Sequence, residues 1–134
     1  IENWPVAAIK SYIGHSLGSA SGDQFTAALG VWQHGLIPGI HSIDSIAEDV
    51  AQKHLSFSKE HKQIDPGELQ YSILNSKGFG GNNASATVLS PGVVAKMLKK
   101  RYSKTEWQAW QNANEAVREQ QQSYDDAMIA GTEK

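Results

Sequence analysis

The sequence contains no cysteine, no long hydrophobic run and no strong excess of charge of either sign. Without cysteine the chain forms neither a disulfide nor a thiolate metal site, and it has no thiol nucleophile of its own. Because no apolar stretch approaches the roughly 18 residues that cross a bilayer, we expect no membrane-spanning helix. The net charge is −2 and the densest basic cluster, residues 96–101, is short, so nucleic acid is not an expected partner.

The 134 residues nevertheless contain enough apolar material for one ordinary folded domain. Hydrophobic residues make up 40% of the chain and charged residues 19%, which is typical of globular rather than disordered proteins. The chain begins at Ile1 rather than Met and ends without an obvious stop. We therefore interpret it as a piece of a longer protein.

The N-terminal third predicts a short strand followed by a helix. Residues 6–9 are all apolar, as in a short buried strand that leads into a loop at Gly14. Apolar residues then recur at the spacing of one helical face, at Phe25, Ala28, Leu29 and Trp32. Ser21 and Gln24, three residues apart, predict a capping box at the start of this helix. Small residues on its other faces indicate that the helix is buried between other elements.

The remainder predicts two strands and then helices. Residues 69–74 and 84–89 are expected to pair as antiparallel strands around a glycine-rich turn, with both faces buried because apolar and polar residues do not alternate. Residues 93–101 predict a helix, and Ser103 with Glu106 predicts a second capping box. A long amphipathic helix follows over 107–128. The change in composition divides the chain into a domain of residues 1–91 and a helical extension of residues 92–134.

Lys10 and His15 are the first candidates for chemistry. They are five residues apart, with Gly14 between them, at the transition from the predicted strand to the predicted helix. This spacing can bring both side chains into one cleft, where a neutral imidazole can donate a hydrogen bond to a developing oxyanion. Taken alone, such a pair in a chain of this length is more often incidental.

The second candidate is the glycine-rich stretch Asn75-Ser76-Lys77-Gly78-Phe79-Gly80-Gly81-Asn82-Asn83. Glycines at this density let backbone amides approach a ligand closely. The stretch is not a phosphate-binding loop, because no Gly-Lys-Ser/Thr follows at the required spacing. It is not a dinucleotide fingerprint either, because a strand rather than a helix follows it. A plain hairpin turn is the favoured interpretation of this motif alone.

Taken together, in this order and about 60 residues apart, the two stretches resemble the β-ketoacyl-[acyl-carrier-protein] synthases. That family has a Lys-Ser-x-x-Gly-His-Ser/Thr-x-Gly stretch, matched here by Lys10, Ser11, Gly14, His15, Ser16 and Gly18. It also has Asn-Ser-Phe-Gly-Phe-Gly-Gly-Thr-Asn-Ala between two strands, matched here by Asn75, Ser76, Gly78, Phe79, Gly80, Gly81, Asn83 and Ala84. Lys77 and Asn82 depart from this pattern. The resemblance covers residues 4 to 90 and identifies the C-terminal half of such an enzyme.

The resemblance implies an α/β fold that is one half of a thiolase-like fold, with a mixed sheet and a buried helix, to which the C-terminal helical extension is added. It implies that His15 stabilises the enolate formed when a malonyl thioester loses carbon dioxide, and that Lys10 tunes the charge around His15. Phe79 is expected to gate the acyl pocket and to contribute its backbone N–H to an oxyanion hole. Gly78, Gly80 and Gly81 are expected to let that loop move and approach substrate.

The resemblance also implies the setting of the enzyme. The expected partners are acyl- and malonyl-loaded acyl carrier protein, the missing N-terminal half of the same protein and a second copy in a homodimer, with no cofactor and no metal, in the cytoplasm. The family's nucleophilic cysteine and its other catalytic histidine are absent from this chain, so the piece alone is expected to be inactive. A non-condensing or decarboxylating relative is the alternative. Surface or packing roles are expected for the four remaining histidines, His34, His41, His54 and His61.

Overall fold

The computed structural model describes residues 3–132, which fall into two compact units. Unit 1 ends at Val93 and unit 2 begins at Val94. Unit 1 mixes helices and strands, whereas unit 2 is helical. None of the helices between residues 3 and 132 is long and apolar enough to cross a membrane.

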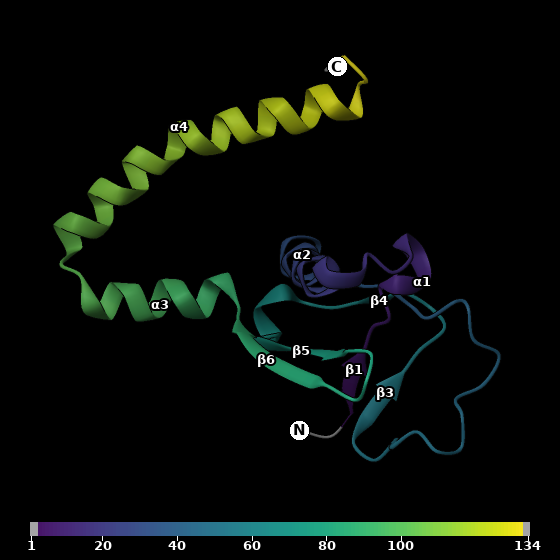
Figure 1. The fold of residues 1–134 in the computed structure, drawn as a ribbon. Helices are drawn as coiled ribbons and strands as arrows, with labels where there is room; N and C mark the ends of the chain where they lie inside the picture. The colour runs from purple at the N-terminus through teal and green to yellow at the C-terminus, as the bar shows by residue number, and fades with distance from the viewer. Residues whose placement is uncertain (1–2, 133–134) are drawn as a thin grey trace. The chain divides into compact units, whose positions relative to one another are not determined.

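Unit 1 holds all of the strands in the described part of the chain (Figure 1). Its elements in chain order are β1 (Trp4–Val6), α1 (Lys10–Ile13), the 3-10 turn η1 (Leu17–Ser19), α2 (Ala20–His34), β2 (Leu36–Ile37), β3 (Leu55–Phe57), β4 (Lys62–Gln63), the 3-10 turn η2 (Pro66–Glu68), β5 (Tyr71–Lys77) and β6 (Asn83–Leu89). The first strand lies earlier than the predicted residues 6–9, because the backbone turns into α1 from Ile9 onward.

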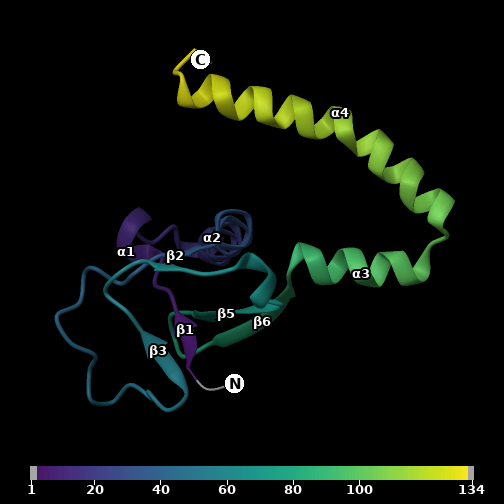
Figure 2. The same cartoon turned by 180° about the vertical axis from the view of Figure 1, so that it is seen from behind.

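The strands form three separate pairs. β1 and β3 are parallel, whereas β2 pairs with β4, and β5 with β6, in antiparallel fashion. Both pairing types of the expected mixed sheet are therefore present, as two-stranded sheets rather than one continuous sheet. The predicted antiparallel pair around the glycine loop is confirmed, with Tyr71 opposite Leu89 at one end and Lys77 opposite Asn83 at the other. Figure 2 shows β1 and β3 side by side.

Helix α2 packs along β5, and the two run in opposite directions. The Ser21 hydroxyl lies 2.8 Å from that of Ser76, and the Gln24 amide donates to the Asn75 carbonyl at 3.2 Å. The predicted capping box of Ser21 and Gln24 is therefore wrong: α2 begins at Ala20, so both residues lie within the helix and their side chains are bonded to β5 instead. The start of α2 consequently lies beside the end of β5.

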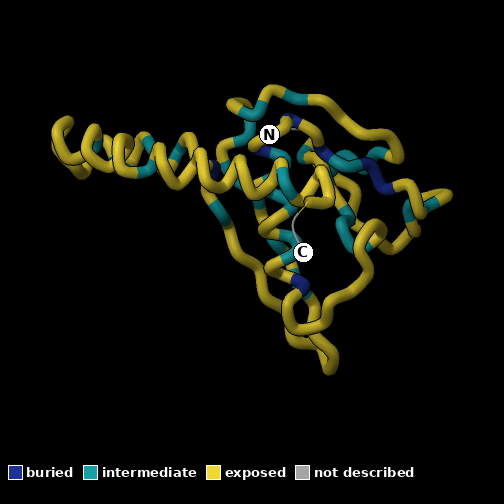
Figure 3. The backbone as a smooth tube through the Cα atoms, turned by 90° about the horizontal axis from the view of Figure 1, so that it is seen from above, coloured by how far each residue is buried: buried dark blue, intermediate teal, exposed yellow. Residues whose placement is uncertain are grey.

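Few apolar residues of unit 1 are buried, and most of the backbone in Figure 3 has the colour of exposed residues. Those that are buried among residues 3–132 are Ala20, Trp32, Ile37 and Ile40. On α2, Phe25 and Leu29 remain 42% and 40% exposed. The prediction that β5 and β6 are buried on both faces is wrong for this chain, because most residues of β6 are exposed and β5 alternates between exposed and half-buried positions.

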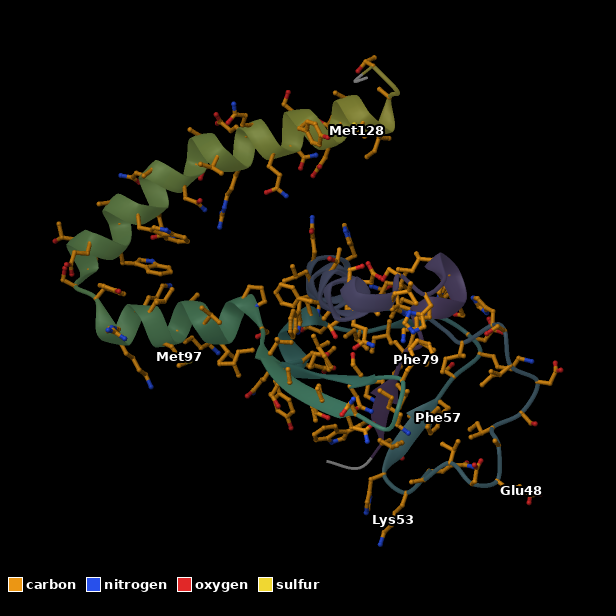
Figure 4. All side chains as sticks on the ribbon, viewed as in Figure 1. Glu48, Lys53, Phe57, Phe79, Met97 and Met128 are labelled. Carbon is orange, nitrogen blue, oxygen red and sulfur yellow. The ribbon has the colours of Figure 1, made fainter. Side chains whose placement is uncertain are left out.

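Unit 2 contains most of α3 (Pro91–Arg101) and all of α4 (Lys104–Ile129). The capping box predicted at the start of the long helix is confirmed, since the Ser103 hydroxyl accepts from the Glu106 N–H and the Glu106 carboxylate accepts from the Ser103 N–H. Near this start, the Lys99 ammonium lies 5.2 Å from the centre of the Trp107 ring. Figure 4 labels Met97 on α3 and Met128 near the end of α4.

Candidate functional site

Lys10 and His15 lie on either side of a sharp turn that follows β1. Lys10 begins α1, a helix of only four residues, and Gly14 ends it with φ of 78°. A side chain at this φ would be strained, so glycine permits the turn that brings the chain back. The Lys10 Nζ and the His15 Nε2 lie 3.5 Å apart as a result. The structure thus brings together the two residues that the sequence singled out.

A backbone contact fixes the orientation of the His15 ring. The Leu17 N–H donates to His15 Nδ1 at 2.9 Å, so Nδ1 is the acceptor and the hydrogen of the neutral imidazole is on Nε2. Nε2–H and the Lys10 ammonium are then both donors, and neither accepts from the other. Two donors this close can share one external acceptor oxygen, which is the arrangement that stabilises a developing oxyanion.

The His15 turn is attached to the start of α2. The Ser16 hydroxyl donates to the Asp23 carboxylate, and the Ser19 hydroxyl donates to the Ser16 carbonyl at 3.0 Å. Leu17 has φ of 57°, in the left-handed region that a leucine rarely occupies. Such strain is maintained only where surrounding contacts enforce it, and it is concentrated at functional sites.

The glycine-rich stretch forms the turn of the β5–β6 hairpin. The Gly78 N–H donates to the Asn82 carbonyl at 2.6 Å and closes the turn, within which Gly80 and Gly81 have φ of 83° and 86°. Phe79 is 90% exposed at this turn (Figure 4). A large apolar side chain this exposed is not stabilised by burial within the chain, and such exposure is typical of a surface that binds a ligand or another segment.

The two predicted segments lie at the same end of unit 1. His15 precedes the start of α2, the Gly78 to Gly81 turn follows the end of β5, and the bonds of Ser21 and Gln24 to β5 hold these ends together. No hydrogen bond joins the turn directly to Lys10 or His15 among the described residues. The arrangement is that of a paired donor site beside a backbone loop.

An apolar cavity of about 740 Å³ lies between β1, α2 and β5. Its walls include residues 4–10 and 70–75, together with Ala27, Ala28 and Val31 of α2. Lys10 is among the lining residues, so the cavity reaches the candidate site. β1 and β5 each have one hydrogen-bonded neighbour among the described strands, and both contribute to this cavity.

Sequence reasoning missed one cluster of polar aromatic residues near the site. His41 and His61 are 20 residues apart, yet their Nε2 atoms lie 3.4 Å from each other, and both rings pack against Tyr12. No local spacing could have revealed this, because the two loops that carry the histidines meet only in three dimensions. Within residues 3–132, no group of three or more His, Cys, Asp or Glu side chains is placed to hold a metal ion.

Comparison with known proteins gives a consistent result. The chain is 45% identical over 131 residues, 98% of its length, to the β-ketoacyl-[acyl-carrier-protein] synthase FabY of Pseudomonas aeruginosa. The crystal structure of that noncanonical ketosynthase superposes with a TM-score of 0.87, again over 98% of the chain. The chain spans only 20% of the length of this relative. No family model matches the sequence.

More distant relatives match a shorter stretch. The polyketide synthase component of the lovastatin nonaketide synthase of Aspergillus terreus is 34% identical over 88 residues, which are 62% of this chain and 3% of that protein. Fatty acid synthase subunit alpha of Gibberella zeae is 33% identical over 82 residues, 61% of this chain and 5% of that protein. The α/β architecture of this chain is thus part of a ketosynthase fold, and the chain belongs to the β-ketoacyl-[acyl-carrier-protein] synthase family as a segment about one fifth the length of its FabY member.

Proposed function

We propose that the chain is the C-terminal part of an acyltransferase that condenses an acyl thioester with malonyl-acyl carrier protein and releases carbon dioxide, in fatty acid or related polyketide biosynthesis. The observation that carries the proposal is the pair of donors formed by His15 Nε2–H and the Lys10 ammonium. The similarity of the chain to FabY over 98% of its length supports the same reaction class.

His15 stabilises the enolate in this mechanism. When the bond between the malonyl carboxylate and C2 breaks, carbon dioxide leaves and the electron pair becomes an enolate whose negative charge lies on the thioester oxygen. His15 Nε2–H donates to that oxygen, and the Lys10 ammonium adds positive charge beside it. One aimed donor of this kind contributes about 3 to 4 kcal/mol to transition-state stabilisation. The enolate carbon then attacks the acyl thioester, whose thiolate leaves.

The hairpin turn shapes the acyl side of the site. Phe79, which is 90% exposed in this chain, acts as the gate of the acyl pocket, and its backbone N–H contributes to the oxyanion hole. Gly78, Gly80 and Gly81 allow the turn to move, since two of them already hold the left-handed conformation that other residues resist. No cofactor and no metal takes part in the proposed reaction.

The remaining part of the synthase completes the fold and supplies the cysteine nucleophile. The cavity of about 740 Å³ exposes two strands and an apolar helix face, and about four fifths of the length of the FabY relative lies outside this chain. Covering apolar surface of this kind with another segment removes it from water and stabilises the fold. We assign residues 1–91 to the synthase domain and residues 92–134 to a helical extension; the division into compact units after Val93 supports this assignment. The full protein is a cytoplasmic homodimer that receives its substrates from acyl carrier protein.

The test is His15→Ala in the full-length synthase. We expect the release of carbon dioxide from malonyl-acyl carrier protein to fall by roughly 10²- to 10³-fold, as for removal of an oxyanion donor. The thermal midpoint should be unchanged, because His15 is exposed. His34→Ala, at a histidine that is also exposed and lies at the far end of α2, is the matched control and should keep full activity. Unchanged condensation by the His15 variant would refute the proposal.

The two members of the reaction class are separated by a second measurement. A synthase with a cysteine nucleophile forms an acyl-enzyme and then a 3-oxoacyl product, whereas a decarboxylating relative releases carbon dioxide without joining the chains. Mass spectrometry of the full-length protein, after incubation with carrier protein loaded with an acyl group, shows whether the acyl-enzyme forms and so distinguishes them. The isolated chain, which has no cysteine, should form no acyl-enzyme by this route.

A further inference from the structure

The helix that carries Lys10 has little to hold it in place. α1 spans four residues, buries none of them, and has no side-chain cap at its start. Isolated helices of this length are not stable in water. A tertiary contact must therefore fix the position of Lys10 relative to His15, and Tyr12, in the same helical turn, makes one.

Tyr12 connects α1 to the loop after β2. Its hydroxyl donates to the Gly39 carbonyl at 2.5 Å, a contact across 27 residues of chain. Its ring lies edge-on to His41, with centroids 5.8 Å apart, and is stacked on His61 at 6.4 Å with an interplanar angle of 26°. Aromatic pairs at these separations add favourable energy beyond the area they bury.

The residues that Tyr12 contacts also contact one another, and we call the group of Gly39, His41 and His61 the histidine platform. The Gly39 N–H donates to His61 Nδ1 at 3.2 Å, so the hydrogen of the neutral His61 ring is on Nε2 and is directed at His41 Nε2, 3.4 Å away. A Cβ at Gly39 would meet the Lys59 carbonyl oxygen at 2.3 Å, which shows how closely the two loops of the platform approach.

We propose that Tyr12 is a positioning residue that acts through Lys10: by docking α1 on the histidine platform, it holds the lysine ammonium beside His15. The proposal rests on the proposed function of the Lys10/His15 pair. It assigns a role to the side chains of Tyr12, His41 and His61, which lie outside the Lys10/His15 pair. A displacement of about 1 Å in a catalytic group is enough to cost a factor of up to 10² in rate, so the loss of this docking should appear in catalysis.

The experiment compares tyrosine variants in the full-length synthase. Tyr12→Ala removes the hydroxyl and the ring, and we expect it to lower kcat about tenfold while KM stays within about twofold, since the lost interaction serves the transition state. Tyr12→Phe keeps the ring packing on the platform and should recover most of this loss. Tyr102→Ala, at a tyrosine of similar exposure (47% against 44%) outside the platform, should leave kcat unchanged.

Hydrogen exchange of the segment 9–15 supplies a readout that a general loss of stability does not imitate. In Tyr12→Ala the α1 amides should exchange faster, while the thermal midpoint changes little. If Tyr12→Ala does not fold, His61→Ala, which removes the stacked ring but leaves α1 intact, carries the same test. A kcat within twofold of the parent in Tyr12→Ala, or in His61→Ala where that variant takes its place, would overturn the inference. Loss of activity in His15→Ala together with full activity in Tyr12→Ala would remove the inference and leave the proposed function standing.

Discussion

The two units of this chain are stabilised by different kinds of contact. Unit 1 depends on bonds between residues far apart in sequence, such as the Trp32 indole to the Leu69 carbonyl and the Ile40 N–H to the Ser58 carbonyl. Unit 2 depends on local bonds, such as the Ser103 capping box and the Gln122 to Asp126 pair one helical turn apart. The catalytic candidates lie in the unit whose structure depends on distant contacts.

This difference explains why unit 1, and not unit 2, has strands that border an open apolar cavity. A helix satisfies its own backbone groups, so α4 needs no neighbour to form its hydrogen bonds. A strand with a free edge and an apolar face needs another segment, and β1 and β5 both border the cavity beside α2. Under the proposed function, the rest of the synthase covers these strands and gives the site its final shape.

The largest difference between the two units is expected for Gly39→Ala in the full-length protein, which should destabilise unit 1 and leave unit 2 unchanged. The added Cβ would lie 2.3 Å from the Lys59 carbonyl oxygen and 2.6 Å from the Glu60 carbonyl carbon, both backbone atoms that cannot rotate away. We expect the free energy of unfolding to fall by about 3 kcal/mol, as for severe overpacking. Hydrogen exchange should accelerate in residues 36–64 and stay unchanged in α4.

Gly92→Ala is the control for this change. A Cβ at Gly92 meets nothing closer than the Ser90 hydroxyl at 3.9 Å, an ordinary contact. It should leave the free energy of unfolding unchanged or slightly raised, because alanine favours helix. If Gly39→Ala were as well tolerated as Gly92→Ala, the close approach of the two loops would be disproved.

The same substitution made once in each unit tests the comparison directly. Trp32→Phe removes a buried indole and its bond to the Leu69 carbonyl, and we expect it to lower the free energy of unfolding by about 2 kcal/mol. Trp110→Phe, at a tryptophan 48% exposed on α4, should cost less than about 0.5 kcal/mol. Denaturant unfolding followed by circular dichroism measures both. Equal losses would mean that α4 is covered as completely as α2.

The part of the structure that could be predicted from sequence follows the same division. Local signals worked: the Ser103 capping box, the long helix to Ile129 and the antiparallel hairpin around Gly78 to Gly81 are all present. The capping box predicted at Ser21 failed because a tertiary contact to Ser76 and the true start of α2 at Ala20 outweighed a local motif. Motif spacing placed Lys10 beside His15, since five residues with a glycine between them determine a turn.

The contacts around that pair could not be predicted in the same way. In the histidine platform, residues 39 and 41 contact His61, and Tyr12 packs on this group. No periodicity in the sequence predicts contacts between residues so far apart. The sequence predicts more burial of β5 and β6 than the structure shows. Apolar composition indicates that a segment is stabilised by burial, but it does not indicate which other segment buries it.

A smaller effect is expected at the cap of α4. Ser103→Ala removes the hydroxyl that accepts from the Glu106 N–H, and loss of such a cap costs about 1 kcal/mol of helix stability. Ser123→Ala, at an exposed serine in the interior of the same helix, should be neutral or slightly stabilising. Hydrogen exchange of the first turn of α4 reports the difference. Equal exchange in both variants would show that the cap contributes nothing.

The smallest effect concerns the other half of the same capping box and its dependence on pH. Hydrogen bonds from the Ser103 hydroxyl, and secondarily from the Ser103 backbone N–H, hold the pKa of the Glu106 carboxyl below its ordinary value. Because the pKa is lower in the folded than in the unfolded state, the stabilisation is complete at neutral pH, above the unfolded value, and is lost as the pH falls through the folded value. Carbon-13 NMR of the Glu106 carboxyl should show this lowered midpoint in the parent and a midpoint closer to the ordinary value in Ser103→Ala. An identical midpoint in the two proteins would show that the Ser103 hydroxyl does not bond to the carboxylate in solution, and unit 2 would then lose one of the local contacts that distinguish it from unit 1.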